Sequence, residues 1–362
     1  MATYFVSDLH LFDVANAHVF GDGVEAVLER WLGELEHTAR LVLVGDILDL
    51  TAMEIPRGLA AFFAALGVPD QPVPQRRSLE EKVARLRAAH PRFFAALGRF
   101  SETHETTFVL GNHDAQLAEE AHPERLTGLD AVRFAPSWSG VERDRTITAI
   151  HGHGWDEANR TDDGWRNRGA GFTSAMMHGA LPYLRRVLAP QGRDVDRLAV
   201  LRPEERVIPV LRRWLTPGAY ERFFDAYFEL LAANGVVPGF ATYFLTPDYV
   251  RARLREDESL WERVAEHGLE VLEGVETLPG RPPPPDVLVA GHTHVLDWAE
   301  HTGRRARRIY CNLGTWTRQF LSAFDRGATL LPLLRVGDDD ACEVAATLTD
   351  LASGDVLNRA EL

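Results

Sequence analysis

The chain of 362 residues is 45% hydrophobic and 25% charged, which allows a large core in one domain or in a domain with an insertion. Its formal net charge of −14 argues against a broad nucleic-acid-binding surface, because such a surface needs an excess of Lys and Arg. The sequence shows no signal peptide and no apolar run long enough for a membrane span, and its two cysteines cannot form a disulfide framework. We therefore expect a cytoplasmic protein without a transmembrane segment.

Five short runs rich in β-branched and aromatic residues have the length of buried strands and end in polar residues or glycine. They are residues 3–7, 41–44, 106–110, 146–150 and 286–290. Their nearly continuous apolar character predicts sheets that are covered on both faces.

Helical patterns lie between these strands. Apolar residues recur at helical spacing over residues 24–35. Ser78 and Glu81 form a capping-box signature, which predicts a helix running through Leu86 and Phe93. The alternation of strand and helix indicates a layered α/β fold.

The region 155–285 breaks this alternation and is predicted to be a helical cap inserted into the core. A Thr-Pro pair at 216–217 begins one helix that Gly235 ends, and a second pair at 246–247 begins another. A proline-rich segment at 281–285 indicates a stiff linker. The remaining segments, 1–154 and 286–350, form the predicted discontinuous core.

Each of the five predicted strands ends in residues that can bind metals. These residues are Asp8 and His10, Asp46, Asn112 with His113 and Asp114, His151 with His153, and His292 with His294. In layered α/β folds, ligands bind at this edge of the sheet. Imidazole and carboxylate together suit borderline metals such as Mn, Fe, Zn or Ni, and a bridging carboxylate can hold two such ions roughly 3.5–4 Å apart.

The order Asp-x-His, Gly-Asp, Gly-Asn-His-Asp, His, Gly-His-x-His resembles the calcineurin-like metallophosphoesterase superfamily. The resemblance implies a four-layer α/β/β/α sandwich with an inserted helical cap. It also implies that a hydroxide bridging two divalent metal ions hydrolyses a small-molecule phosphate mono- or diester. Mn is the first expectation for these ions, with Fe, Zn and Ni as alternatives.

Carried over block by block, the resemblance also assigns residue roles. It implies that Asp8, His10 and His294 bind the first metal, that Asn112, His151 and His292 bind the second, and that Asp46 bridges both. His113 would donate a proton to the leaving group or contact the phosphate, and Asp114 would hold the His113 ring.

Several residues near these blocks have two interpretations. His151 and His153 compete for one ligand position, and His151 is favoured because it follows its strand directly. Asp49 is interpreted either as a partner of a ligand or as a turn cap. Arg166 belongs to a group with Asp156, Asn159 and Arg160 that could clamp phosphate or begin a solvated helix. The Asn-Leu-Gly-Thr-Trp turn at 312–316 resembles a supporting turn of the superfamily.

Three other functions remain as alternatives. The Ser-Asp-Leu-His-Leu opening at 7–11 and the His block followed by Asp and Arg at 151–166 are reminiscent of UDP-2,3-diacylglucosamine diphosphatases, a subfamily that hydrolyses a pyrophosphate and takes up acyl chains in a helical insert. His113 stands where that subfamily has Arg, and the insert is longer. A non-catalytic binding module on the same fold would lack some of the ligand blocks. A nuclease on this fold would carry a basic groove.

Overall fold

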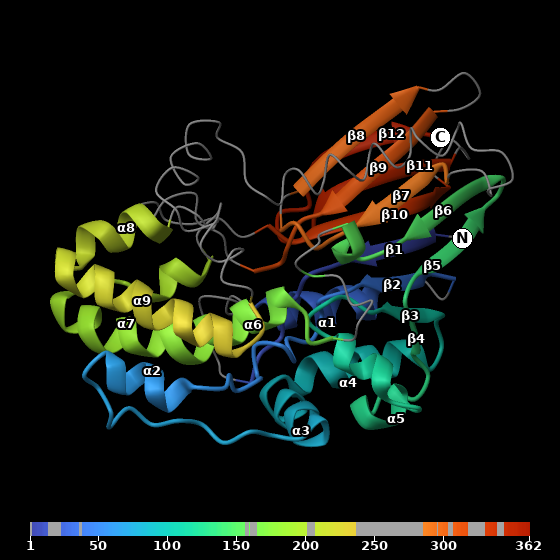
Figure 1. Cartoon of the computed structure of the whole chain (residues 1–362). Coiled ribbons are helices and arrows are strands. Elements are labelled where there is room, and N and C mark those ends of the chain that lie inside the picture. Colours follow the sequence, from blue (N-terminus) through green and yellow to red (C-terminus); the bar gives the residue numbers. More distant parts are fainter. Residues whose placement is uncertain are drawn as a thin grey trace, which may run out of the picture.

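Two β-sheets and two groups of helices build the fold (Figure 1). The computed structural model describes residues 2–13, 23–35, 38–155, 159, 165–200, 207–236, 285–294, 296–302, 307–317, 330–338 and 344–362. The strands are β1 (Ala2–Val6), β2 (Arg40–Val44), β3 (Thr106–Val109), β4 (Arg133–Ala135), β5 (Trp138–Glu142), β6 (Arg145–Ala149), β7 (Val287–Ala290), β8 (Leu296–Thr302), β9 (Arg307–Leu313), β10 (Pro332–Asp338), β11 (Val344–Asp350) and β12 (Val356–Glu361). Each of the five predicted strands is confirmed, with ends that coincide with the prediction or differ from it by one residue.

The first sheet has the order β12-β11-β10-β1-β2-β3-β4, and the second has the order β5-β6-β7-β9-β8. Strands β1 to β4 run parallel to one another, as do β6, β7 and β9. Because parallel strands end at the same edge, the polar residues that follow β1, β2 and β3 are brought side by side. For the predicted four-layer α/β/β/α sandwich with a helical cap, a mixed α/β fold with two sheets and helices is confirmed.

Alternation along the strands places an apolar residue on each face of a sheet. In β2, Val42 and Val44 face the second sheet, whereas Leu41 and Leu43 face the helices. The inter-sheet cluster draws on both sheets and includes Phe5, Val42, Val44, Val109, Trp138, Ile147, Val287, Val289, Ile309 and Leu334. The two sheets therefore pack face to face, as expected for strands that are apolar on both sides.

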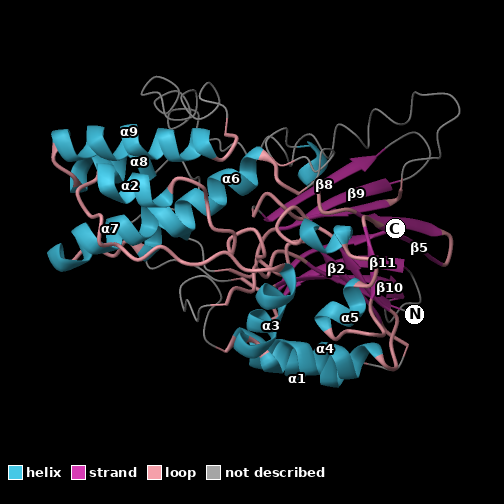
Figure 2. Cartoon of the chain, turned by 60° about the horizontal axis from the view of Figure 1, so that its bottom comes forward, coloured by secondary structure: helices cyan, strands magenta, loops and turns pink. Residues whose placement is uncertain are grey.

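The outer face of the first sheet is covered by the first group of helices, seen below the sheets in Figure 2. This group consists of α1 (Val24–Glu34), α3 (Leu79–Ala89), α4 (Pro91–Ser101) and α5 (Pro123–Thr127), with the short 3₁₀ helix η1 (Ala115–Glu119). The predicted capping box of Ser78 and Glu81 is present. The expectation that its helix runs on to Phe93 is wrong, because Pro91 cannot continue a helix and instead begins α4.

The second group of helices lies to one side of the sheets (Figure 1). It comprises α2 (Leu59–Ala65), α6 (Arg168–Ala175), the π-helical turn η3 (Met176–Ala180), α7 (Leu181–Leu188), α8 (Val207–Trp214) and α9 (Pro217–Ala233), with the short 3₁₀ helices η2 (His153–Trp155), η4 (Ala189–Gln191) and η5 (Asp196–Val200) nearby in sequence. Helix α9 confirms the prediction for 216–235. The predictions for the helix after 246 and for the linker at 281–284 lie outside the described residues.

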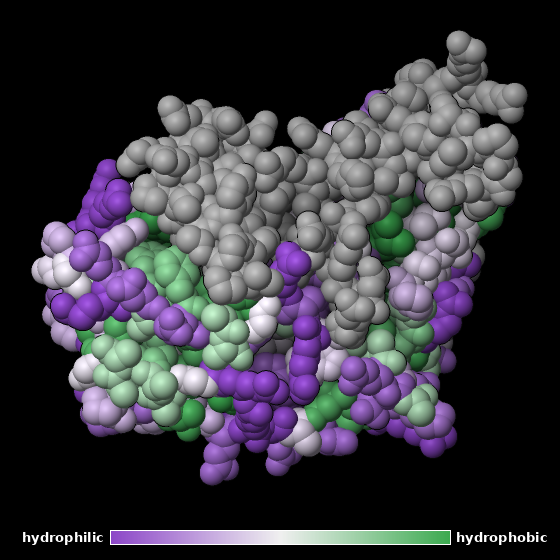
Figure 3. All heavy atoms as spheres, in the orientation of Figure 1, coloured by the Kyte–Doolittle hydropathy of each residue, from purple (hydrophilic) through white to green (hydrophobic). Residues whose placement is uncertain are grey.

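An apolar helical-layer cluster holds this second group together. It includes Leu59, Phe62, Leu181, Tyr183, Leu184, Leu211, Phe223, Tyr227 and Leu231, while Phe224 and Phe228 pack against it half-buried. Helix α2 belongs to this cluster although it precedes the region predicted as the cap. Figure 3 shows apolar residues gathered over this part of the surface, whereas the lower edge of that face is mostly hydrophilic.

Candidate metal centre

The residues that follow the strands adopt a strained backbone. Among described non-glycine residues, those with positive φ are Asp8 (53°), His10 (47°), Asp46 (52°), His292 (73°), His294 (58°) and Arg143 (54°). Such conformations cost about 1–3 kcal/mol each and collect at functional sites. Apart from Arg143, all of them are predicted metal ligands, which indicates that the fold bends sharply to aim these side chains at one place.

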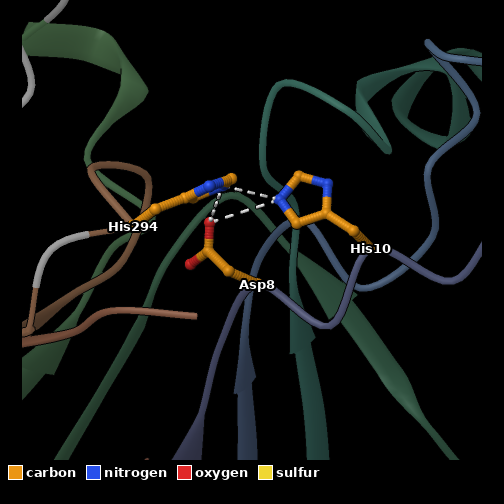
Figure 4. A group of neighbouring side chains, drawn as sticks. All are labelled: Asp8, His10 and His294. Atoms are coloured by element: carbon orange, nitrogen blue, oxygen red, sulfur yellow. Dashed lines mark hydrogen bonds and ion pairs between the residues drawn. The ribbon is translucent and has the colours of Figure 1, made fainter. Parts of the chain in front are cut away.

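The first predicted ligand group converges. The carboxylate of Asp8 and the rings of His10 and His294 point toward one another (Figure 4). His10 Nε2 lies 2.8 Å from His294 Nε2 and 3.6 Å from Asp8 Oδ1, and His294 Nε2 lies 3.3 Å from that same oxygen. Two ring nitrogens and a carboxylate oxygen therefore face a common point, which is the arrangement that a divalent cation needs.

A second group is formed by Asp46, His151 and His292, all of them buried. His151 Nδ1 donates to the Val44 carbonyl at 2.9 Å, which directs Nε2 toward Asp46 Oδ2 at 3.1 Å. A backbone bond of this kind fixes the tautomer of a ligating histidine. His151 Nε2 is buried and has no hydrogen-bond partner among the described residues, so it can ligate a metal ion when the ring is neutral.

Asp46 belongs to the second group and also lies close to the first. Its Oδ2 is 3.1 Å from His151 Nε2 in one group and 3.8 Å from His10 Nε2 in the other. Its Oδ1 accepts a hydrogen bond from the His113 backbone N–H at 2.8 Å. A Cβ at Gly111 would collide with Asp46 Oδ1, which explains why glycine precedes Asn112.

Asn112 is also buried at this site. Its Nδ2 donates to Asn159 Oδ1 at 3.3 Å, whereas its Oδ1 is buried and has no hydrogen-bond partner among the described residues. An unsatisfied buried oxygen is costly, and a metal ion would satisfy it. The donor set of carboxylate, imidazole and amide oxygen thus fits divalent cations at both positions.

The carboxylate that orients His113 is Asp49. His113 Nδ1 lies 2.6 Å from Asp49 Oδ1, and Asp49 Oδ2 lies 3.4 Å from His10 Nδ1. The expectation that Asp114 holds the His113 ring is therefore wrong. Adjacent side chains on a turn diverge, and Asp114 instead accepts from the backbone N–H groups of Gly111 at 2.6 Å and Ile47 at 2.9 Å.

Asp49 fits both interpretations of the sequence, a partner of a predicted ligand and a turn cap. It contacts the rings of His10 and His113, and its Oδ1 also accepts from the Ala52 backbone N–H at 2.9 Å. The atoms of His10, Asp49 and His113 form a third convergent trio. Both histidines present Nδ1 to Asp49 in this trio, so we interpret it as a hydrogen-bonded partner of the ligand groups.

The electrostatics favour cations at the centre. Burial opposes ionisation of Asp46, but His151 and His113 outweigh burial and hold the pKa of Asp46 well below its usual value. Burial also disfavours the charged form of His151, yet the carboxylates of Asp46 and Asp8 raise its pKa to about 9. A divalent cation would replace these protons, because histidine must be neutral to ligate a metal.

The turn at 312–316 supports the first ligand group, as its sequence suggested. Thr315 Oγ1 donates to the Asp8 carbonyl at 2.7 Å, and Asn312 Nδ2 donates to the Gly291 carbonyl at 2.8 Å. Gly291 itself approaches Asp8 so closely that a Cβ would collide with the Asp8 carboxylate.

Other residues singled out in the sequence have different positions. The His153 ring is 5.5 Å from the His151 ring and 6.4 Å from the His292 ring, and it belongs to none of the convergent groups. Arg166 lies over the ring of Trp165 at 4.6 Å, and Asp156 and Arg160 lie outside the described residues.

The family profile of calcineurin-like phosphoesterases matches residues 1–296. The chain belongs to this family. It is similar to Vps29 in complex with Zn²⁺ from Entamoeba histolytica, with 11% identity, 100% of this chain and 99% of that chain covered, and a TM-score of 0.33. It is also similar to an uncharacterized protein from Streptococcus pneumoniae, described as a predicted phosphoesterase, with 10% identity, 100% and 97% covered, and a TM-score of 0.31.

A third similar structure is a 5′-nucleotidase precursor from Thermus thermophilus, with 13% identity, 100% of this chain and 53% of that chain covered, and a TM-score of 0.29. No curated protein matches the chain. Within the described part of the chain, no helix is long and apolar enough to cross a membrane.

Proposed function

We propose that this calcineurin-like phosphoesterase hydrolyses a phosphate mono- or diester with the help of two divalent cations. The observation that supports the proposal most directly is the position of Asp46 between two groups of converging ligands. Asp8, His10 and His294 would hold one ion, and Asn112, His151 and His292 would hold the other. Bound at these residues, the two ions would supply an activated water and neutralise charge on the phosphate.

His113 is proposed as the general acid for the leaving group. Its side chain is 16% exposed, so it can reach a substrate, and Nδ1 is held by Asp49 while Nε2 lies 4.0 Å from Asp46 Oδ2. Burial disfavours the imidazolium, but the charges of Asp49 and Asp46 outweigh burial and raise the pKa of His113. The raised pKa favours the protonated ring, which can donate its proton to the departing oxygen.

The test uses metal-stripped protein with and without Mn²⁺, assayed on p-nitrophenyl phosphate and bis-p-nitrophenyl phosphate. We expect Mn²⁺ to restore hydrolysis, and the ratio of the two rates to distinguish a monoesterase from a diesterase. Asp46→Asn should remain inactive because the residue between the two ions loses its charge.

Asp350→Asn is the matched control. Asp350 is a buried carboxylate that accepts hydrogen bonds from Leu331 N and Ser353 Oγ, and neither partner is a predicted metal ligand. It should retain activity. If two Mn²⁺ ions bind and no phosphate ester or pyrophosphate is cleaved, a binding role on this fold replaces the proposal. Cleavage of DNA alone would identify a nuclease.

A pyrophosphate hydrolase that accepts acylated nucleotide sugars is the second candidate. The helical-layer cluster favours this candidate, because it offers apolar surface for an acyl chain. This helical layer is joined to the segment after β2 by His178 of η3, which donates to the Ala52 carbonyl at 2.7 Å. A panel of nucleotide-sugar diphosphates with and without acyl chains tests this candidate. Preference for acylated substrates would support it, and equal rates on both would count against it.

A further inference from the structure

The start of α6 is connected to the candidate metal centre through one residue, Asn159. This asparagine is 5% exposed and accepts a hydrogen bond from Asn112 Nδ2 on its Oδ1. Its own backbone carbonyl accepts from Asn167 Nδ2 at 2.8 Å. Asn167 is also the N-cap of α6, where its Oδ1 accepts from Ala170 N at 2.8 Å.

The contact matters because an asparagine can bind a metal through only one end of its amide. The oxygen has lone pairs, whereas the NH₂ group has two donors and nothing to offer a cation. The two orientations of the Asn112 amide have almost the same shape, so packing alone does not choose between them. The Asn159 acceptor holds the NH₂ end, which leaves the opposite end of the amide, the buried and unpartnered Oδ1, for a cation.

Asn159 is itself held in place from two directions. Asn167 binds its carbonyl, and Gly169 in the first turn of α6 lies against its side chain. A Cβ at Gly169 would collide with Asn159 Oδ1, so only glycine allows the helix to approach this closely. The position of α6 and the direction of the Asn112 amide are therefore linked.

We propose that Asn159 is a positioning residue for the second metal ion. It fixes the Asn112 amide with its oxygen toward the ion, and it makes occupancy of that position depend on the start of α6. This inference rests on the proposed function, because it takes Asn112 as a ligand of the second ion. It assigns a role to a residue outside the five ligand blocks.

The experiment is calorimetric titration of metal-stripped protein with Mn²⁺, which reports the affinity of each position and the number of ions bound. In Asn159→Ala we expect one position to keep its affinity and the other to weaken by about 10-fold to 100-fold, as is usual when the partner of a ligand is removed. Asn159→Asp retains an acceptor for Asn112 Nδ2 and should restore binding at the second position.

Gly169→Ala provides an independent perturbation, because its Cβ would displace the Asn159 side chain while the amide group of Asn159 is retained. Alanine is the better helix former, so this variant should keep α6 folded while it weakens the second position. The matched control is Asn234→Ala. Asn234 makes a similar bridge, with Arg57 N donating to its Oδ1 at 2.8 Å and its Nδ2 donating to Arg57 O at 3.0 Å, but it contacts no ligand.

The outcomes are distinguishable. Asn234→Ala should leave both Mn²⁺ affinities unchanged, and the double variant Asn112→Ala/Asn159→Ala should bind no more weakly than Asn112→Ala, because both changes act on one ligand. Two unaltered affinities in Asn159→Ala and Gly169→Ala would overturn the inference while the proposed function stands. A wild-type chain that binds fewer than two Mn²⁺ ions would overturn both.

Discussion

Removal of the Asp49 carboxylate tests which residue controls the proposed general acid. In Asp49→Asn, the charge-assisted contact of 2.6 Å to His113 Nδ1 is replaced by a neutral one. A hydrogen bond to a charged group contributes about 1.5–3 kcal/mol, which is the stabilisation of the imidazolium that the substitution would remove. His113 is only 16% exposed, so solvent screens little of this interaction.

The sign of the effect follows from the charge that is lost. Asp49 favours the imidazolium and raises the pKa of His113, so the substitution lowers that pKa. A general acid works only while protonated, and activity is lost as pH rises through its pKa. We therefore expect the alkaline limb of kcat/KM to move to lower pH in Asp49→Asn.

The assay compares phenyl phosphate with p-nitrophenyl phosphate over a range of pH in the presence of Mn²⁺. Phenolate is the more basic leaving group and needs the proton, so the substitution should slow phenyl phosphate far more than p-nitrophenyl phosphate. Asp114→Asn is the comparison, because Asp114 binds only backbone N–H groups in this region. If Asp114→Asn moves the alkaline limb and Asp49→Asn does not, the assignment of Asp49 is refuted.

Three further predictions concern metal binding and stability. Gly291→Ala should abolish metal binding at the first position, because the new Cβ would collide with the Asp8 carboxylate. Gly33→Ala is the control, since its Cβ would enter open space and both Mn²⁺ ions should still bind. The number of Mn²⁺ ions bound per chain is the measurement that distinguishes the two variants. Glu54→Gln leaves the buried Lys82 ammonium without its ion-pair partner and should lower the free energy of unfolding in urea by about 3 kcal/mol, and a loss below about 1 kcal/mol would contradict this. Tyr227→Phe removes a buried hydroxyl that has no partner among the described residues, and should raise the free energy of unfolding by about 1 kcal/mol; a loss of stability would mean that the hydroxyl is bonded.

The chain itself determined the strands, the order of the ligand blocks and the family. Strand periodicity is local, so the alternation of Leu41, Val42, Leu43 and Val44 already indicates two buried faces. Residues that follow parallel strands must meet at one edge of the sheet, and Asp46 therefore could be placed near the other ligands from its position alone. The Ser78 capping box was equally local and equally predictable.

The sequence was less informative where two signals competed. Apolar spacing extended the helix after Ser78 across Pro91, although the ring of proline breaks the helical hydrogen-bond pattern there. Helix α2 precedes the predicted cap in the sequence but packs with α9 and η3, because its apolar face, Leu59, Phe62 and Phe63, is complementary to theirs. Surface complementarity between distant segments has no local pattern.

Only the tertiary structure decided which side chains touch. Asp114 is adjacent to His113 in the sequence, yet Asp49, 64 positions away, binds the ring. Asn159 lies 47 positions from Asn112 and was grouped in the sequence only with possible phosphate contacts, yet it accepts a hydrogen bond from the Asn112 amide. Side-chain hydrogen bonds depend on direction and on a distance of about 3 Å, which the order of residues does not encode. The sequence thus specifies which side chains gather at the candidate centre, and the packing of α6 and of the residues after β2 specifies which contacts those side chains make.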